Sequence, residues 1–118
     1  MILEKFGFKF GIFGLAEKEW VDTVHSYYHD KLEYVDFVEY GELMVNTLRE
    51  DHGCDFIIAL THMMGYNDTK LANSVEGIDL ILGGHDHTIR SEQIKNIPVI
   101  KSGTNFKQFS VISARKSK

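Results

Sequence analysis

The sequence has one cysteine, Cys54, one proline, Pro98, and no long apolar run. A single cysteine cannot form an intrachain disulfide, which favours a reducing compartment, and Cys54 is expected to be a buried thiol. No apolar stretch approaches the roughly 18 residues that cross a bilayer, and the first ten residues are too charged for a secretory signal. The sequence therefore predicts no membrane contact and favours a cytoplasmic location, without fixing the compartment.

Positive charge is also in short supply. Lys and Arg total 13 against 17 Asp and Glu, a formal net charge of −4. This balance excludes a nucleic-acid binder that relies on bulk positive charge. With 118 residues, 43% of them hydrophobic, the chain has the profile of one soluble globular domain.

Short apolar segments rich in β-branched and aromatic residues predict strands. Residues 8–15, 55–60 and 79–84 are almost continuously apolar, which is typical of parallel strands buried on both faces. Residues 98–103 and 108–114 alternate more and are expected to form a C-terminal antiparallel pair. The fold class is therefore α/β.

Three helices are expected between these strands. Residues 17–28 and 39–52 carry apolar stripes at helical spacing, and Gly53 follows as a C-terminal stop. The third helix, within residues 67–75, should begin at Asn67 or Asp68 as its N-cap. The stripe residues, all expected in the core, are Trp20, Val24, Tyr27, Leu43, Met44, Thr47 and Leu48.

Two of the predicted strands should bring histidines to one edge of the sheet. Residues 55–84 read as strand, helix, strand, so the two strands should be parallel with their carboxyl ends side by side. His62 follows the first, and His85 and His87 follow the second. Such imidazoles suit Zn²⁺, Mn²⁺, Fe or Co²⁺, whereas a histidine near a strand end can also be a polar loop residue.

Other polar residues have more than one reading. Gly83 and Gly84 should let the chain turn sharply after the strand. Asn67 and Asp68 could support a ligand histidine or cap the next helix. Asp68 and Asp86 could also bind metal, Asp86 could instead brace its loop, and Thr88 could be a turn hydroxyl or a support. Asp55 and Asp79 begin their strands and should lie at the opposite edge. The remaining histidines, His25, His29 and His52, are expected on the surface.

The segments "DFIIALTHM" and "LANSVEGIDLILGGHDHT" resemble the C-terminal half of a calcineurin-like metallophosphoesterase domain of the 5′-nucleotidase group. The resemblance runs from "FGIFGL" to "IKSGTNFKQFSVI". It implies half of an αββα sandwich, with a parallel βαβ core, and hydrolysis of nucleotides or related phosphate esters by two divalent metal ions. It also implies that His62 and His85 serve one metal and His87 the other.

Three family elements do not occur in this sequence: Asp-x-His, Gly-Asp-x-x-Asp and Gly-Asn-His-Glu. In the family they supply the bridging carboxylate, further ligands and a histidine near the leaving group. Residues 1–118 are therefore expected to be one partial domain that binds at most one metal ion weakly and is inactive alone. Its partner would be the missing N-terminal half or a second copy. The alternative is a truncated, non-catalytic paralogue that acts as a metal-binding or protein-interaction module.

Overall fold

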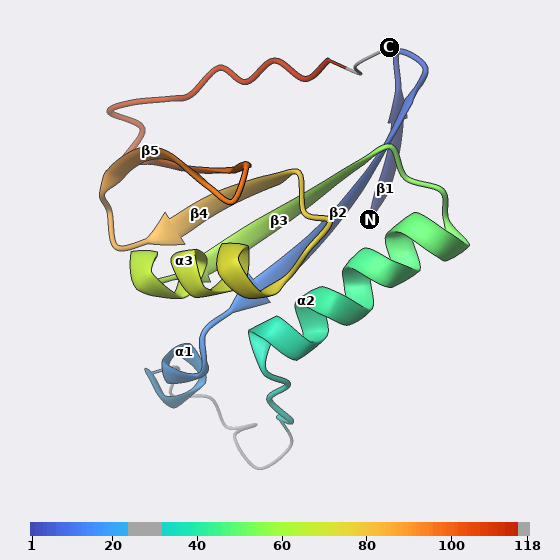
Figure 1. The fold of residues 1–118 in the computed structure, drawn as a ribbon. Coiled ribbons are helices and arrows are strands. Elements are labelled where there is room, and N and C mark those ends of the chain that lie inside the picture. Colours follow the sequence, from blue (N-terminus) through green and yellow to red (C-terminus); the bar gives the residue numbers. More distant parts are fainter. Residues whose placement is uncertain (24–31, 116–118) are drawn as a thin grey trace.

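A single mixed sheet organises the computed structural model, which describes residues 1–23 and 32–115 (Figure 1). Its six strands lie in the order β1-β2-β3-β4-β6-β5. The four central strands β2, β3, β4 and β6 are parallel, and β1 and β5 pair antiparallel at the two edges. The strands are β1 Ile2–Lys5, β2 Phe8–Ala16, β3 Phe56–Met63, β4 Leu80–His85, β5 Ile89–Ile94 and β6 Ile97–Ser102. The predicted α/β class and parallel β3–α3–β4 unit are confirmed.

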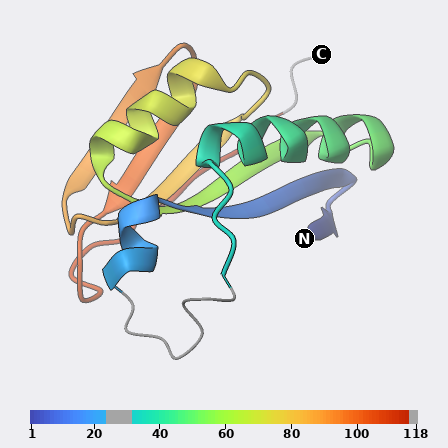
Figure 2. The same ribbon diagram turned by 90° about the horizontal axis from the view of Figure 1, so that it is seen from below.

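Helices α2 (Phe37–Asn46) and α3 (Gly65–Ser74) cover one face of the sheet, and the short α1 (Lys18–Thr23) lies beyond the end of β2 (Figure 2). A π-helical turn, Thr47–Asp51, continues α2. Gly53 then ends the segment with φ +61°, as predicted. No helix in the described part of the chain is both long and apolar enough to cross a membrane.

Two of the predicted helical stripes are corrected by the structure. Trp20 is 40% exposed instead of buried, and Leu43 is 59% exposed. Leu48 is buried and Met44 packs against the core, as predicted. On α2 the core face consists of Phe37, Gly41 and Val45, a stripe that points away from Leu43. Asp36 caps the helix, which begins two residues before the predicted start. Val24, Tyr27, His25 and His29 lie outside the described residues.

The two faces of the sheet differ in burial. Alternate residues such as Ile57, Ala59 and Ile81 are fully buried beneath the helices, whereas the residues between them face the other way and are only half-buried. Leu60, in the central strand β3, is 46% exposed on this second face. We call it the open face. The expectation that the parallel strands are buried on both faces was therefore wrong for the residues described.

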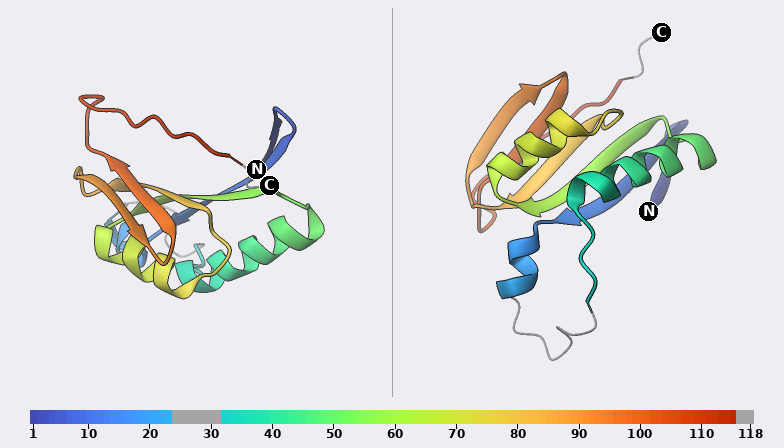
Figure 3. Two further views of the ribbon diagram at one scale, coloured as in Figure 1. Left: turned by 45° about the horizontal axis from the view of Figure 1, so that its top comes forward. Right: turned by 60° about the horizontal axis from the view of Figure 1, so that its bottom comes forward.

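The segment that follows β6 runs across the open face (Figure 3). Residues 108–114 were expected to be a strand, but they form none. The physical reason is that β6 is already paired on both sides, with β4 and β5, so this segment cannot pair with it as expected. The antiparallel partner of β6 is β5, which the sequence analysis did not predict.

Candidate metal centre

Strand register brings two of the predicted histidines together at the carboxyl edge of the sheet. In the parallel β3–β4 pair, His62 lies opposite Gly84 and Met63 lies opposite His85. His62 Nε2 and His85 Nδ1 are 3.1 Å apart, and the two ring centroids are 4.9 Å apart. Both residues belong to the strands, which extend beyond their predicted ends at Leu60 and Gly84. The rigid sheet therefore holds both imidazoles.

The spacing of these two nitrogens suits one shared metal ion. A metal–imidazole bond is about 2.0–2.1 Å long, so two ligand nitrogens on one tetrahedral ion stand about 3.4 Å apart. The 3.1 Å between His62 Nε2 and His85 Nδ1 is close to that value. The two side chains thus fit a shared ion with little rearrangement.

His87 does not join this pair. It is exposed in the turn after β4, and within residues 1–23 and 32–115 no group of three or more His, Cys, Asp or Glu side chains is placed to hold a metal ion. Both His85 and His87 have positive φ values, 87° and 55°. The sharp turn is therefore made by the histidines themselves and not, as expected, by Gly83 and Gly84.

Gly83 has a different role. A Cβ atom at this position would lie 2.8 Å from Lys101 Cε and 3.1 Å from Asp68 Oδ2. Both neighbours belong to a buried charged cluster, so Gly83 leaves space for it. Gly84, on the other side of the strand, would place its Cβ 3.8 Å from His62 Nδ1, an ordinary contact.

That buried cluster consists of Lys101, Asp68, Asp86 and Thr61 and lies beneath the histidine pair. Lys101 Nζ lies 2.9 Å from Asp68 Oδ2 and 3.0 Å from Asp86 Oδ2. It also donates hydrogen bonds to the backbone carbonyls of Met63 and Gly84. Lys101 therefore ties the carboxyl ends of β3 and β4 together, next to the residues that carry the two imidazoles.

Asp68 and Asp86 both differ from simple loop residues. Asp68 is fully buried, accepts a hydrogen bond from Thr61 Oγ1 and is not the N-cap of α3. Asp86 braces the turn: it accepts hydrogen bonds from Gly65 N, at the start of α3, and from Thr88 Oγ1. Burial alone would raise the pKa of Asp86, but hydrogen bonds from Lys101 and Thr88 and the charge of Lys101 lower it below the ordinary value.

Glu17 is a site residue that the sequence analysis missed. It follows β2, where Ala16 lies opposite His62, and it is only 3% exposed. Its Oε1 lies 3.3 Å from His85 Nε2, the ring nitrogen turned away from His62. Its Oε2 accepts hydrogen bonds from Met64 N and from Asn67 Nδ2. The available signal was its position directly after a predicted parallel strand, at the same edge as the histidines.

Asn67 is therefore linked to His85 through Glu17. The prediction that Asn67 or Asp68 caps α3 was wrong, because the helix begins at Gly65 with Met64 as its N-cap. Trp20 borders the same site: its ring centroid lies 4.5 Å from that of His62 and 5.8 Å from that of His85. Trp20 and Glu17 give the pair one aromatic and one acidic neighbour.

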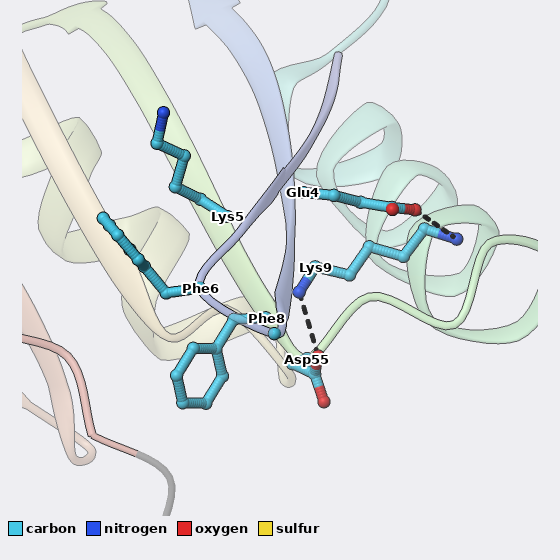
Figure 4. A pocket seen from close by; sticks show the side chains of 7 residues that line it. Glu4, Lys5, Phe6, Phe8, Lys9 and Asp55 are labelled. Atoms are coloured by element: carbon cyan, nitrogen blue, oxygen red, sulfur yellow. Dashed lines mark hydrogen bonds and ion pairs between the residues drawn. The ribbon is translucent and has the colours of Figure 1, made fainter.

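The opposite edge of the sheet has different chemistry. Asp55 accepts a hydrogen bond from Lys9 N and borders a hollow at the β1–β2 turn with Lys5 and Phe6 (Figure 4). Asp79 pairs with Arg49. Both aspartates thus lie at the edge predicted for them, and neither approaches the histidines. His52 is exposed and Cys54 is buried, also as predicted.

Several curated proteins match most of the chain in sequence, and three of them are described here. The trifunctional nucleotide phosphoesterase protein YfkN of Bacillus subtilis is 36% identical over 89 residues, 75% of this chain and 6% of that protein. The snake venom 5′-nucleotidase of Macrovipera lebetinus is 38% identical over 80 residues, 68% of this chain and 19% of that protein. The apyrase of Tabanus yao is 33% identical over 89 residues, 75% of this chain and 16% of that protein. No family model matches the sequence.

Solved structures share the fold at lower identity. Sulfate thiohydrolase SoxB of Thermus thermophilus has a TM-score of 0.74 at 23% identity, covering 87% of this chain and 19% of that one. The NAD nucleotidase NadN of Haemophilus influenzae has a TM-score of 0.73 at 20% identity, covering 87% of this chain and 24% of that one. A putative 5′-nucleotidase from Staphylococcus aureus has a TM-score of 0.69 at 18% identity, covering 88% of this chain and 23% of that one.

The sheet and these matches show that the chain resembles part of a metallophosphoesterase-type domain. More narrowly, it matches the 5′-nucleotidase C-terminal region of these relatives, as the sequence analysis predicted. It spans no more than 19% of the length of the curated relatives described above.

Proposed function

We propose that this chain supplies two imidazole ligands to a metal centre that hydrolyses phosphate esters of nucleotides. The observation that carries the proposal is the 3.1 Å approach of His62 Nε2 to His85 Nδ1 at the carboxyl edge of a parallel sheet. Ligands of α/β sheets bind at that edge. The names of the relatives, a nucleotide phosphoesterase, a 5′-nucleotidase and an apyrase, support a nucleotide substrate.

The chain's own residues have separate roles in the proposed site. His62 and His85 present nitrogen lone pairs, and the carboxylate of Glu17 holds the second nitrogen of His85. Trp20 lies against His62. A divalent ion such as Zn²⁺, Mn²⁺, Fe²⁺ or Co²⁺, when bound, would polarise a phosphoryl oxygen and make a water molecule more acidic.

Two imidazoles are too few for a pair of metal ions. The described residues around the histidines offer no free bridging carboxylate, because Asp68 and Asp86 are engaged by Lys101. Glu17 faces the outer nitrogen of His85 and accepts hydrogen bonds from the start of α3. We propose that the three absent family elements come from another polypeptide segment that packs on the open face, and that His87 then ligates a second ion. The 118-residue chain alone is expected to bind at most one ion weakly and to be inactive.

Trp20 offers a direct test of this proposal. It is the chain's single tryptophan, and its ring adjoins that of His62. In untagged protein, Co²⁺ should quench the tryptophan emission saturably, with no more than one equivalent bound. His62→Ala and His85→Ala should remove the effect, and the matched control His52→Ala, an exposed histidine elsewhere, should retain it. Equal quenching in the wild type and in His62→Ala/His85→Ala would overturn the metal assignment.

Catalysis is tested separately with 5′-AMP and bis-p-nitrophenyl phosphate in the presence of Zn²⁺ or Mn²⁺. The isolated chain should give no turnover above that of the His62→Ala/His85→Ala variant. Turnover that is abolished by His85→Ala would show that the chain is a complete enzyme, and the predicted inactivity would be wrong.

A non-catalytic binding module is the second candidate. The observation that favours it is the open face, where Leu60 is 46% exposed in the central strand. Large exposed apolar surfaces usually bind partners. The two candidates share the fold and the histidine pair, but only the first requires a segment with carboxylate ligands. Co-expression with a polypeptide that carries the three absent elements should produce phosphoesterase activity for the first candidate and none for the second.

A further inference from the structure

Glu17 lies on the far side of His85 from His62. Three adjacent strands each contribute one group to this row: Glu17 after β2, His62 in β3 and His85 at the end of β4. Glu17 Oε1 lies 3.3 Å from His85 Nε2, and His85 Nδ1 lies 3.1 Å from His62 Nε2. The three side chains therefore form a continuous polar row from a buried carboxylate to an exposed imidazole.

We propose that Glu17 is a positioning residue that fixes the tautomer of His85, so that its Nδ1 lone pair is directed at His62. The inference rests on the proposed function in one respect, that this lone pair is the one a metal ion would take. It does not depend on which metal binds, or on whether the chain alone is active.

The position of the carboxylate is set by its other oxygen. Glu17 Oε2 accepts hydrogen bonds from Met64 N at 2.9 Å and from Asn67 Nδ2 at 2.6 Å. These donors lie at the start of α3, so the beginning of that helix fixes the carboxylate in place. Oε1 is left facing His85 Nε2. Because a buried carboxylate oxygen needs a donor, the proton of a neutral His85 ring belongs on Nε2.

The proton on His62 follows from the same row. If Nε2 of His85 carries the hydrogen, its Nδ1 is an acceptor, and His62 Nε2 must be the donor across the 3.1 Å contact. A metal ion shared by the two rings would need the lone pair of His62 Nε2. His62 would then release that proton to water and take one on Nδ1, while His85 would keep its tautomer. The tautomer of His85 is thus already the one that a metal ion requires, whereas the tautomer of His62 changes when the ion binds.

The substitution Glu17→Gln separates this role from simple space filling. The glutamine oxygen can still accept from Met64 N and Asn67 Nδ2, but its NH₂ group then faces His85 Nε2. That ring nitrogen becomes an acceptor, and the proton of a neutral His85 moves to Nδ1. The matched control is Glu19→Gln, which removes the same charge from an exposed position two residues away.

The measurement is the ¹⁵N–¹H long-range correlation spectrum of ¹⁵N-histidine-labelled, metal-free protein at about pH 8, above the ordinary histidine pKa. His85 should be the Nε2–H tautomer in the wild type and in Glu19→Gln, and the Nδ1–H tautomer in Glu17→Gln. An Nδ1–H tautomer in the wild type would overturn the proposal, whether or not a variant folds. So would an unchanged His85 tautomer in a folded Glu17→Gln.

A Co²⁺ titration of the same proteins distinguishes this proposal from the proposed function. Glu17→Gln should bind about 10–100-fold more weakly than the wild type, the range typical of residues that hold a ligand histidine, and Glu19→Gln should bind equally well. If the tautomers behave as expected but the wild type binds no Co²⁺, the metal centre is wrong and the positioning role stands. If Glu17→Gln retains both the tautomer and the affinity, the positioning role is wrong and the metal centre stands.

Discussion

Gly83 marks a point in β4 where the chain has no room for a side chain. The Gly83→Ala methyl group would press on Lys101 and Asp68, which are held by buried ionic contacts and cannot move aside. Overpacking of this kind costs about 1–3 kcal/mol. We therefore expect Gly83→Ala to lower the free energy of unfolding by that amount in urea denaturation.

The neighbouring residue supplies the control. A methyl group at Gly84 meets nothing closer than 3.8 Å, and Gly→Ala at a compatible site stabilises by about 0.4–1 kcal/mol through the unfolded chain. Gly84→Ala should therefore be neutral or slightly stabilising. Equal destabilisation by both substitutions would show that the close packing around Lys101 is not the cause.

At the residue scale the sequence predicted the histidine pair because strand topology alone determines it. Parallel strands joined by one crossover commonly pair, and their carboxyl ends then lie side by side, as β3 and β4 do. The role of Glu17 could not be predicted in the same way, because it depends on a third strand and on hydrogen-bond donors at the start of α3. Asn67 was misassigned because α3 begins earlier, without a side-chain cap.

At the element scale Lys101 joins β6 to the carboxyl ends of β3 and β4. Lys101→Met keeps the aliphatic length but removes the charge that Asp68 and Asp86 face. Breaking a buried ion pair by removing one partner costs about 3–5 kcal/mol. We expect a loss of that size in the free energy of unfolding. Lys107→Met, at an exposed position after β6, should change it by less than about 0.5 kcal/mol.

A second substitution checks the reason for that loss. In Lys101→Met/Asp68→Leu the unpaired buried carboxylate of Asp68 is gone, and much of the lost stability should return, since an apolar replacement of a buried pair is often neutral. A double variant that is less stable than Lys101→Met would show that the ion pair matters less than the hydrogen bonds to the Met63 and Gly84 carbonyls.

Central strands were predictable and edge strands were not. The near-continuous apolar composition of residues 8–15, 55–60 and 79–84 identified β2, β3 and β4, since a strand buried by neighbours needs apolar side chains. The edge strands β1 and β5 are largely exposed, so their composition carries little signal. Their hairpins turn at Phe6-Gly7 and Lys95-Asn96, all four residues with positive φ. Of these four, only Gly7 and Asn96 are typical turn residues.

At the scale of the whole molecule, the open face distinguishes this chain from a closed α/β layer. In the part that the structure describes, α2 and α3 cover one side of the sheet, and only the segment after β6 crosses the other (Figure 3). That segment is itself apolar and exposed: Phe109 is 78% and Val111 84% exposed. Apolar surface on both the sheet and its partial cover is typical of an interface without its partner.

We therefore expect the isolated chain to self-associate, because a second copy is the only available cover for the open face in a purified sample. Light scattering should show a mass that rises with concentration above the 13.5 kDa of one chain. Leu60→Glu, which places a charge in the centre of the open face, should shift the population towards the monomer. Leu43→Glu, on the outer side of α2, makes the same change at a comparably exposed leucine and should leave the association unaltered. A wild-type chain that stays monomeric at the highest attainable concentration would mean that the segment after β6 covers the sheet well enough, and that no partner is needed there.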